Sequence, residues 1–309
     1  MKHALALVAL LAALLPASVQ AQTPALLGVW GSDGNGPGQF HHPAGVAVGA
    51  DGNVYVADSG NHRIQVFTSA GVFVTQWGAD GTSPSSLSAP IHVGVDRNGH
   101  AVVTESEGHS NSQTLVQEFT TTGVYISSWL PGGSASGSTS FGSPFGVTVG
   151  PDGRVLITDD TRLWIYSVDG TYLADWPVSG KGLAVDANGI VYVMDTGCGC
   201  VRKLSTSGSQ IASWPSGALD LAADAAGNVF TADMASNRVI AYDSSGGLLA
   251  TWGTFGTEPG QFYAPRGIAV GPDGRVYVAD TYNNRIQVFG ALPTHTRSES
   301  WGRLKAAYR

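Results

Sequence analysis

Apolar and polar residues alternate along most of the chain in short runs. The runs 54–57, 63–67 and 72–77 are rich in Val, Ile, Tyr and Phe, and Gly, Asp, Asn or Ser residues lie between them. Such runs are typical of β-strands, and the residues between them are typical of tight turns. The chain also contains 42 glycines without a collagen-like period. The pattern predicts an all-β protein built from many short strands.

The strand pattern repeats along the chain. The frame of residues 45–58 recurs at 267–280, and a turn glycine marks each copy. Successive turn glycines stand 36 to 54 residues apart, and an acidic residue follows each of them after six positions. The glycines are Gly52, Gly99, Gly153, Gly189, Gly227 and Gly274, and the acids are Asp58, Glu105, Asp159, Asp195, Asp233 and Asp280. Repeats of this length with several short strands predict a six-bladed β-propeller.

We expect each blade to contain four strands, named a to d from the axis outward. The sixth unit loses the pattern after Phe289, so its fourth strand is missing, while a spare strand-like run stands at 26–31. This run resembles 248–253, the fourth strand of the fifth unit. We therefore expect the N-terminal strand to close the last blade, which removes the open edges of the ring. The propeller is expected to span residues 25–289.

Two side-chain positions recur in every unit. Six of the eight tryptophans end a strand d, and we interpret them as packing residues because one position repeated in all units indicates architecture. The acid that follows strand b is interpreted as a hydrogen-bond acceptor within its blade or as the partner of an arginine five residues later, as in Asp58 and Arg63. The tryptophans are Trp30, Trp77, Trp129, Trp176, Trp214 and Trp252.

The two ends of the chain lack the repeat. Lys2, an apolar run at 4–15 and the sequence Val19-Gln20-Ala21 have the layout of a secretory signal peptide at residues 1–21. We expect cleavage after Ala21 and a secreted or periplasmic protein without a transmembrane segment, since a spanning helix needs about 20 apolar residues. Residues 290–309 form a basic tail, for which a sorting or docking element and a frayed terminus both remain open.

Charge and cysteine content narrow the partners. The net charge is −7, and loss of Lys2 with the signal peptide makes it more negative. An acidic chain without a basic patch in its repeats repels phosphates, so nucleic acid is not expected as a partner. Cys198 and Cys200 are too few for a structural zinc site, and an oxidised pair and spare thiols both remain open.

The first and sixth units resemble the NHL repeat. The runs 37–43 and 259–265 share Pro-Gly-Gln-Phe, and the runs 61–67 and 283–289 share Arg-Ile-Gln-Val-Phe. The resemblance, to an exported bacterial-type NHL propeller, implies six blades over nearly the whole mature chain. It does not select a function because one fold hosts many. Relatives include protein- and RNA-binding modules, exported proteins of unknown role and a peptide-amidating lyase.

The lyase relatives imply a zinc site made by three histidines from different blades, and also calcium. Here only His92 stands at a strand a position that faces the axis. The equivalent positions are Gly45, Gly146, Gly182, Asp220 and Gly267. We therefore expect no cofactor and no catalytic residues, with zinc or calcium as the alternative. A Ser-His-Asp set, a phosphate loop and a nucleotide fingerprint are not evident in the sequence.

Loop lengths suggest where a ligand binds. The longest d–a and b–c connections, which emerge on the same face, cluster around the second unit at 78–89, 105–113 and 130–142. Function often resides in such loops, although neutral drift of Ser- and Gly-rich loops is the alternative. We hypothesise a ligand-binding surface around His92, Glu105, Glu107 and His109. The expected function is a monomeric scaffold for a protein, peptide or glycan, with a metal-dependent lyase or hydrolase as the alternative.

Overall fold

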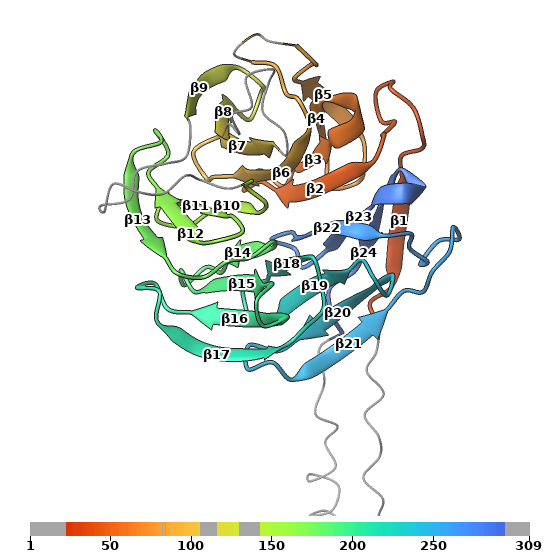
Figure 1. The fold of residues 1–309 in the computed structure, drawn as a ribbon. Coiled ribbons are helices and arrows are strands. Elements are labelled where there is room, and N and C mark those ends of the chain that lie inside the picture. Colours follow the sequence, from red (N-terminus) through yellow and green to blue (C-terminus); the bar gives the residue numbers. More distant parts are fainter. Residues whose placement is uncertain (1–22, 82, 84, 106–115, 130–142, 294–309) are drawn as a thin grey trace, which may run out of the picture.

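The computed structural model describes residues 23–81, 83, 85–105, 116–129 and 143–293. Its strands form six antiparallel sheets of four strands, arranged as blades around a central axis (Figure 1). The expected six-bladed propeller is confirmed. The segment 1–21 and residues 294–309 of the tail lie outside the described residues, so the signal peptide and the sorting element stay predictions.

The first five blades follow chain order from the axis to the rim. Blade 1 comprises β2 (Pro43–Val48), β3 (Val54–Asp58), the 3₁₀ turn η1 (Ser59–Asn61), β4 (Arg63–Phe67) and β5 (Phe73–Trp77). Blade 2 comprises β6 (Pro90–Val95), β7 (His100–Glu105), β8 (Val116–Thr120) and β9 (Tyr125–Trp129). Blade 3 comprises β10 (Val147–Val149), β11 (Val155–Thr158), β12 (Leu163–Tyr166) and β13 (Tyr172–Trp176). Blade 4 comprises β14 (Leu183–Val185), β15 (Val191–Asp195), β16 (Cys200–Leu204) and β17 (Gln210–Pro215), and blade 5 comprises β18 (Asp220–Ala223), β19 (Val229–Asp233), β20 (Arg238–Tyr242) and β21 (Leu248–Trp252).

Blade 6 joins the two ends of the ring. It comprises β22 (Pro265–Val270), β23 (Val276–Asp280), the 3₁₀ turn η2 (Thr281–Asn283), β24 (Arg285–Phe289) and, at the rim, β1 (Leu26–Trp30). Figure 1 shows β1 in red beside the blue β24. The pairing is antiparallel, with Trp30 opposite Ile286 and Gly28 opposite Val288, and the Gly290 amide donates to the Ala25 carbonyl over 2.8 Å. The predicted closure by the N-terminal strand is confirmed.

The hydrophobic core lies between neighbouring blades. Val54, Val56 and Phe67 of blade 1 pack against Tyr277 and Ala279 of blade 6, and all five are buried. Each fully buried side chain of the larger kinds contributes roughly 1.5–3 kcal/mol to the stability of the fold. The repeated β-branched and aromatic positions therefore join the blades together.

The repeated tryptophans seal the junctions between blades near the rim. The ring of Trp77 at the end of blade 1 lies over Gly123, in the c–d turn of blade 2. A Cβ on that glycine, whose φ is +89°, would stand 2.4 Å from the ring. The same contact joins Trp129 to Gly170, and these contacts confirm the predicted packing role.

The acids that follow strand b hold the loops above their blades. Asp58 is fully buried, and its Oδ2 accepts hydrogen bonds from Arg63 Nε (2.8 Å), Asn61 Nδ2 (2.9 Å) and Gln65 Nε2 (3.0 Å). Its Oδ1 accepts from the His41 amide at 2.8 Å. The predicted acceptor role and the predicted arginine pairing are therefore both present in the same carboxylate.

Candidate functional site

The innermost strands approach each other so closely that only small residues fit at one position. A Cβ on Gly267 would lie 2.2 Å from the Ala44 carbonyl oxygen, and one on Gly182 would lie 2.6 Å from the Cα of Asp220. Glycine occupies this position in four blades, which leaves space at the axis for the side chains of the other two. Those two side chains are His92 and Asp220.

His92 and Asp220 meet at the axis. His92 lies on β6 of blade 2 and Asp220 on β18 of blade 5, three blades further around the ring. The imidazole Nε2 stands 3.2 Å from Asp220 Oδ2, and only 12% and 6% of the two side chains are exposed. Asp220 Oδ2 also accepts the Ile268 amide at 3.1 Å, which fixes the carboxylate against blade 6.

The surroundings favour the protonated form of His92. Burial acts to lower the pKa of His92, but the charge of Asp220 and its hydrogen bond outweigh burial and raise the pKa above its ordinary value. Two buried atoms of the pair, His92 Nδ1 and Asp220 Oδ1, form no hydrogen bond with the part of the chain that the structure describes. A buried polar atom without a partner costs free energy, so a water or ligand group is favoured that accepts from Nδ1–H of the protonated His92 or donates to Asp220 Oδ1.

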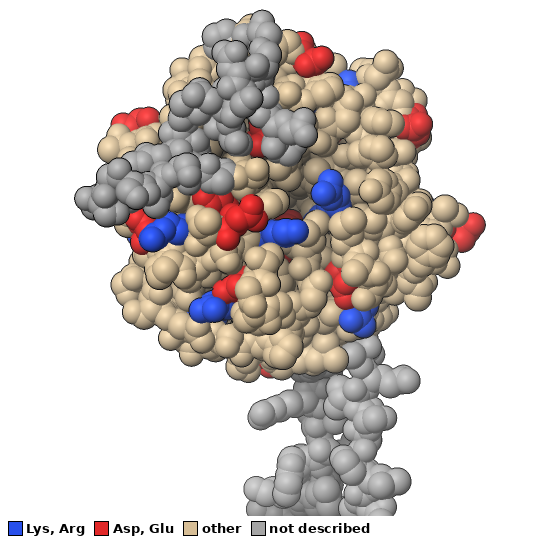
Figure 2. Space-filling view, viewed as in Figure 1, with Lys and Arg blue, Asp and Glu red and all other residues tan. Residues whose placement is uncertain are grey.

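A pocket of about 80 Å³ opens over this pair at the start of the innermost strands. Its lining includes two cationic residues, Lys181 and Arg266, in addition to His92, Asp220 and the apolar Phe145. Lys181 Nζ lies 5.4 Å from the centre of the Phe145 ring, and Arg266 is exposed. The pocket has room for a few waters or one small polar group. Figure 2 shows Lys and Arg groups near the centre of the propeller face, with Asp and Glu groups around them.

The four residues predicted as a binding surface have different surroundings. His92 lines the channel pocket, as its strand position predicted. Glu105 is fully buried, where its Oε2 accepts the Ser88 amide and its Oε1 accepts Gln117 Nε2 at 2.6 Å. Glu105 therefore belongs with the buried acids that hold loops. Glu107 and His109 lie outside the described residues, so a surface that includes them stays a prediction.

Sequence reasoning missed the two cations of the pocket. Lys181 and Arg266 each stand directly before an axis glycine, Gly182 and Gly267. A cation at that position lies at the mouth of the channel because strand a begins there. This adjacency to the axis glycines is the signal in the sequence that marks the two cations.

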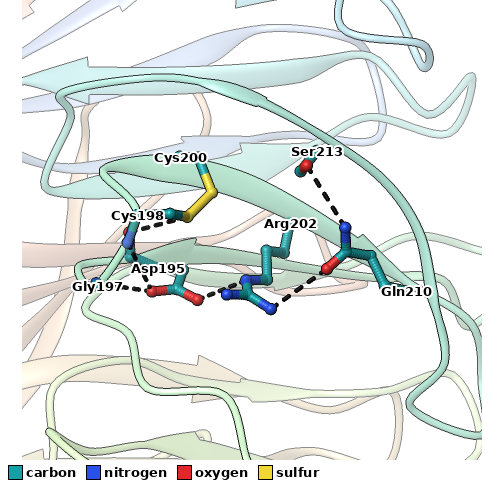
Figure 3. Close-up of a disulfide and its surroundings, with 7 residues drawn as sticks. All are labelled: Asp195, Gly197, Cys198, Cys200, Arg202, Gln210 and Ser213. Carbon is teal, nitrogen blue, oxygen red and sulfur yellow. Dashed lines mark hydrogen bonds and ion pairs between the residues drawn. A yellow bond between two sulfur atoms is a disulfide. The ribbon is translucent and has the colours of Figure 1, made fainter.

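A disulfide joins Cys198 and Cys200 in the b–c loop of blade 4 (Figure 3). It lies beside the ion pair of Asp195 with Arg202, whose Nε stands 2.5 Å from Asp195 Oδ2. The other oxygen of Asp195 accepts the Gly197 amide at 2.7 Å. The sequence left the state of this pair open, and in the structure the pair is oxidised and braces the loop.

The described residues contain no group of three or more His, Cys, Asp and Glu side chains arranged to hold a metal ion. His92 and Asp220 supply two donors, and a zinc site with three protein ligands requires another. The described residues therefore do not fit the three-histidine zinc site that the resemblance to the amidating lyases implies. Among the same residues, no helix is long and apolar enough to span a membrane.

Sequence comparison identifies two segments of the chain. The model of the NHL repeat matches residues 40–67 and 262–289. The B-box type zinc finger protein ncl-1 of Caenorhabditis elegans is 56% identical over 39 residues, which are 13% of this chain and 5% of that protein. The human E3 ubiquitin-protein ligase TRIM32 is 26% identical over an alignment of 178 residues, which covers 52% of this chain and 26% of that protein. The chain thus spans about a quarter of the length of TRIM32 and a much smaller share of ncl-1.

Structural comparison finds propellers with diverse roles. A gluconolactonase of Xanthomonas campestris superposes with a TM-score of 0.60 at 16% identity, over 83% of this chain and 88% of that one. The virginiamycin B lyase of Staphylococcus aureus gives 0.54 at 15% identity, over 82% and 85%. A chain of a nidogen/laminin complex gives 0.57 at 18% identity, over 74% and 84%. Identities this low support the fold alone.

Proposed function

Since this chain is a six-bladed β-propeller that contains NHL repeats, we propose that it is a binding scaffold for a polypeptide ligand. The ligand would lie on the face where the innermost strands begin, over the mouth of the channel. The observation that carries the proposal is the pocket over His92 and Asp220 with Lys181 and Arg266 at its edge. The nidogen/laminin complex contains a chain of similar fold, which is consistent with a protein ligand.

The charges of the pocket select the ligand group. Lys181 and Arg266 attract an anion, and charge-assisted hydrogen bonds to a carboxylate are stronger than neutral ones. Asp220 Oδ1, which is buried and has no hydrogen-bond partner among the described residues, could accept a ligand N–H that lies next to the carboxylate. A peptide carries both groups at its C-terminus, where the carboxylate follows a backbone amide. The pocket therefore supports capture of a peptide carboxylate at the channel mouth.

The experiment that tests this function is a selection of peptides with free C-termini on the purified protein. We expect selected peptides to bind about tenfold more weakly to Lys181→Ala or Arg266→Ala, the effect of losing one charge-assisted hydrogen bond. Amidation of the peptide C-terminus should have the same effect. The control is Arg275→Ala, because Arg275, whose side chain is 38% exposed, lies at the a–b turn of blade 6, on the opposite face. Peptides that bind all variants and the amidated form equally would refute the proposal.

A second candidate function is acid–base catalysis at His92. One imidazole nitrogen is held by the Asp220 carboxylate, and the other, Nδ1, is buried without a partner among the described residues, an arrangement suited to general acid–base catalysis. The metal-dependent version of this candidate is tested by the metal content of the purified protein and by thermal melts with and without chelator. Stoichiometric zinc and a melting temperature lowered by chelator would favour the lyase-like function over the scaffold.

A further inference from the structure

Five exposed rings form a continuous line across the junction between blade 6 and blade 1. In spatial order they are Phe255, Tyr263, Tyr282, His42 and His41, and we call them the aromatic ridge. Successive ring centroids stand 5.1, 5.0, 5.3 and 4.4 Å apart. The rings come from the d–a connections before β22 and β2 and from η2, so the ridge lies on the same face as the channel mouth.

The rings of the ridge are partly exposed to solvent. Phe255 is 65% exposed, Tyr282 47% and Tyr263 43%. A contiguous set of exposed aromatic side chains is unfavourable for a free protein and often marks a place where a partner binds.

Blade 1 shows that the backbone does not need the rings. The loops of blades 1 and 6 have the same course, with a bridge from Asp33 to Phe40 in one and from Phe255 to Phe262 in the other. The equivalents of Phe255, Tyr263 and Tyr282 in blade 1 are Asp33, His41 and Gly60. Both loops are fixed by the same side-chain bond, from Asn61 Nδ2 to the Gly34 carbonyl and from Asn283 Nδ2 to the Gly256 carbonyl, each at 2.9 Å.

The angles between the rings indicate the shape of the ligand. The planes of Phe255 and Tyr263 cross at 82°, those of Tyr263 and Tyr282 at 61°, and those of Tyr282 and His42 at 84°. Rings set edge to face leave notches between them, whereas a sugar ring stacks on an open flat face. Polyproline II segments are bound by proteins through sets of aromatic side chains. Their carbonyls make no internal hydrogen bonds, so the exposed tyrosine hydroxyls can donate to them.

The charge at one end of the ridge orients the ligand. Asp33 Oδ1 lies 3.2 Å from His41 Nδ1, and the Asp33 side chain is 69% exposed. The other carboxylate oxygen of Asp33, Oδ2, forms no ion pair with the described part of the chain. A basic residue of the ligand at this end would complete the charge balance of the carboxylate.

We infer that the aromatic ridge binds a proline-rich segment in the polyproline II conformation, with a Lys or Arg at the end that meets Asp33. The inference rests on the proposed scaffold function and names the segment that the polypeptide partner presents. Proline residues occupy the notches, and the stiff segment loses little conformational entropy when it binds.

The test is calorimetric titration of the full chain with a decaproline peptide that carries one terminal arginine. Substitution by the blade 1 equivalents gives variants whose backbone the fold already accepts: Phe255→Asp, Tyr263→His and Tyr282→Gly. We expect each to weaken binding about tenfold, as for loss of one aromatic anchor, without a change in melting temperature. The control Leu248→Ala removes another exposed apolar side chain, 64% exposed on the rim strand β21, and should bind like the wild type.

The charge pairing between the terminal arginine of the peptide and Asp33 gives an independent readout. Replacement of the peptide arginine by glutamate should weaken binding, and Asp33→Asn should abolish the difference between the two peptides. The inference is overturned if the wild type does not bind the peptide at millimolar concentration, or if the ridge variants bind it unchanged. It is also overturned if a neutral oligosaccharide binds the ridge in its place. Carboxylate capture by Lys181 and Arg266 is measured separately, so either proposal can fail alone.

Discussion

His92 Nε2 and Asp220 Oδ2 stand 3.2 Å apart across the propeller axis, on blades that face each other. The pair ties β6 to β18, two strands that are separated by three blade positions and share no sheet. The contact is possible because glycine at the equivalent positions of the other four blades leaves the axis free. The protonation of His92 is therefore coupled to the stability of the fold.

The first prediction concerns pH. Because Asp220 raises the pKa of His92 in the folded protein, the pair stabilises the fold fully below the unfolded value of about 6.5. This stabilisation is lost as the pH rises through the higher folded pKa. The difference in melting temperature between the wild type and His92→Gln should therefore be largest near about pH 6 and shrink toward about pH 9. In an Asp220→Asn background His92→Gln should show no such trend, and a difference that grows with pH would contradict the assignment.

The second prediction concerns the axis glycines. Gly267→Ala places a Cβ 2.2 Å from the Ala44 carbonyl oxygen and 2.9 Å from the Gly45 Cα, so the backbone of β2 or β22 must shift. We expect a loss of about 1–3 kcal/mol or more in the free energy of unfolding, the usual cost of overpacking. Gly217→Ala is the control, because nothing lies within 4 Å of its added Cβ. Denaturant titration measures both, and equal stabilities would show that the innermost strands can spread.

The third prediction compares two arginines that each pair with an aspartate. Arg63 is 6% exposed and its guanidinium donates to Asp58, to Gln76 Oε1 and to three loop carbonyls. Arg63→Ala leaves the buried Asp58 carboxylate without its cation and should cost about 3–5 kcal/mol. Arg275 pairs with Asp273 at the surface, so Arg275→Ala should cost less than about 1 kcal/mol. Similar melting temperatures for the two variants would refute the structural role of the buried acids.

The fourth prediction concerns ring closure. Deletion of residues 26–30 removes β1, exposes the edge of β24 and takes away the Trp30 ring, whose centroid lies 4.8 Å from that of Phe67 in blade 1. We expect a lower melting temperature and self-association on size-exclusion chromatography, because unpaired edges recruit other strands. Leu27→Ser, which changes a half-exposed side chain of the same strand, should leave both properties unchanged. A monomeric deletion variant with an unchanged melt would contradict the closure.

The architecture was largely predictable from sequence because each blade is encoded by a local sequence repeat. The turn glycines, the acids after strand b and the tryptophans after strand d gave six blades and the closing strand. One boundary differs: β2 begins at Pro43, two residues before the repeated frame of residues 45–58, and its register against β3 shifts between Pro43 and Val46. Bulges arise from pairing with the neighbouring strand and leave little trace in one strand's pattern.

The site was less predictable because it depends on contacts between distant blades. Position alone identified His92 and even its equivalent Asp220, but their pairing depends on blades 2 and 5 facing each other, 128 residues apart. Glu105 illustrates the opposite case, since its place in an enlarged loop suggested a ligand while its repeat position placed it among the buried acids. The aromatic ridge was missed because its rings are dispersed over 242 positions and no single loop contains more than two of them.

The junction that carries the aromatic ridge is also the last one that a growing polypeptide can complete. His41 and His42 leave the ribosome with the first blade, whereas Tyr282 follows about 240 residues later, just before the final strand pair. Two bonds across this junction, from the His42 amide to Asn284 Oδ1 and from Thr281 Oγ1 to the Pro43 carbonyl, each of 2.8 Å, form only when the ring shuts. A nascent or truncated chain therefore displays no ridge, and a partner that recognises the ridge recognises only finished molecules.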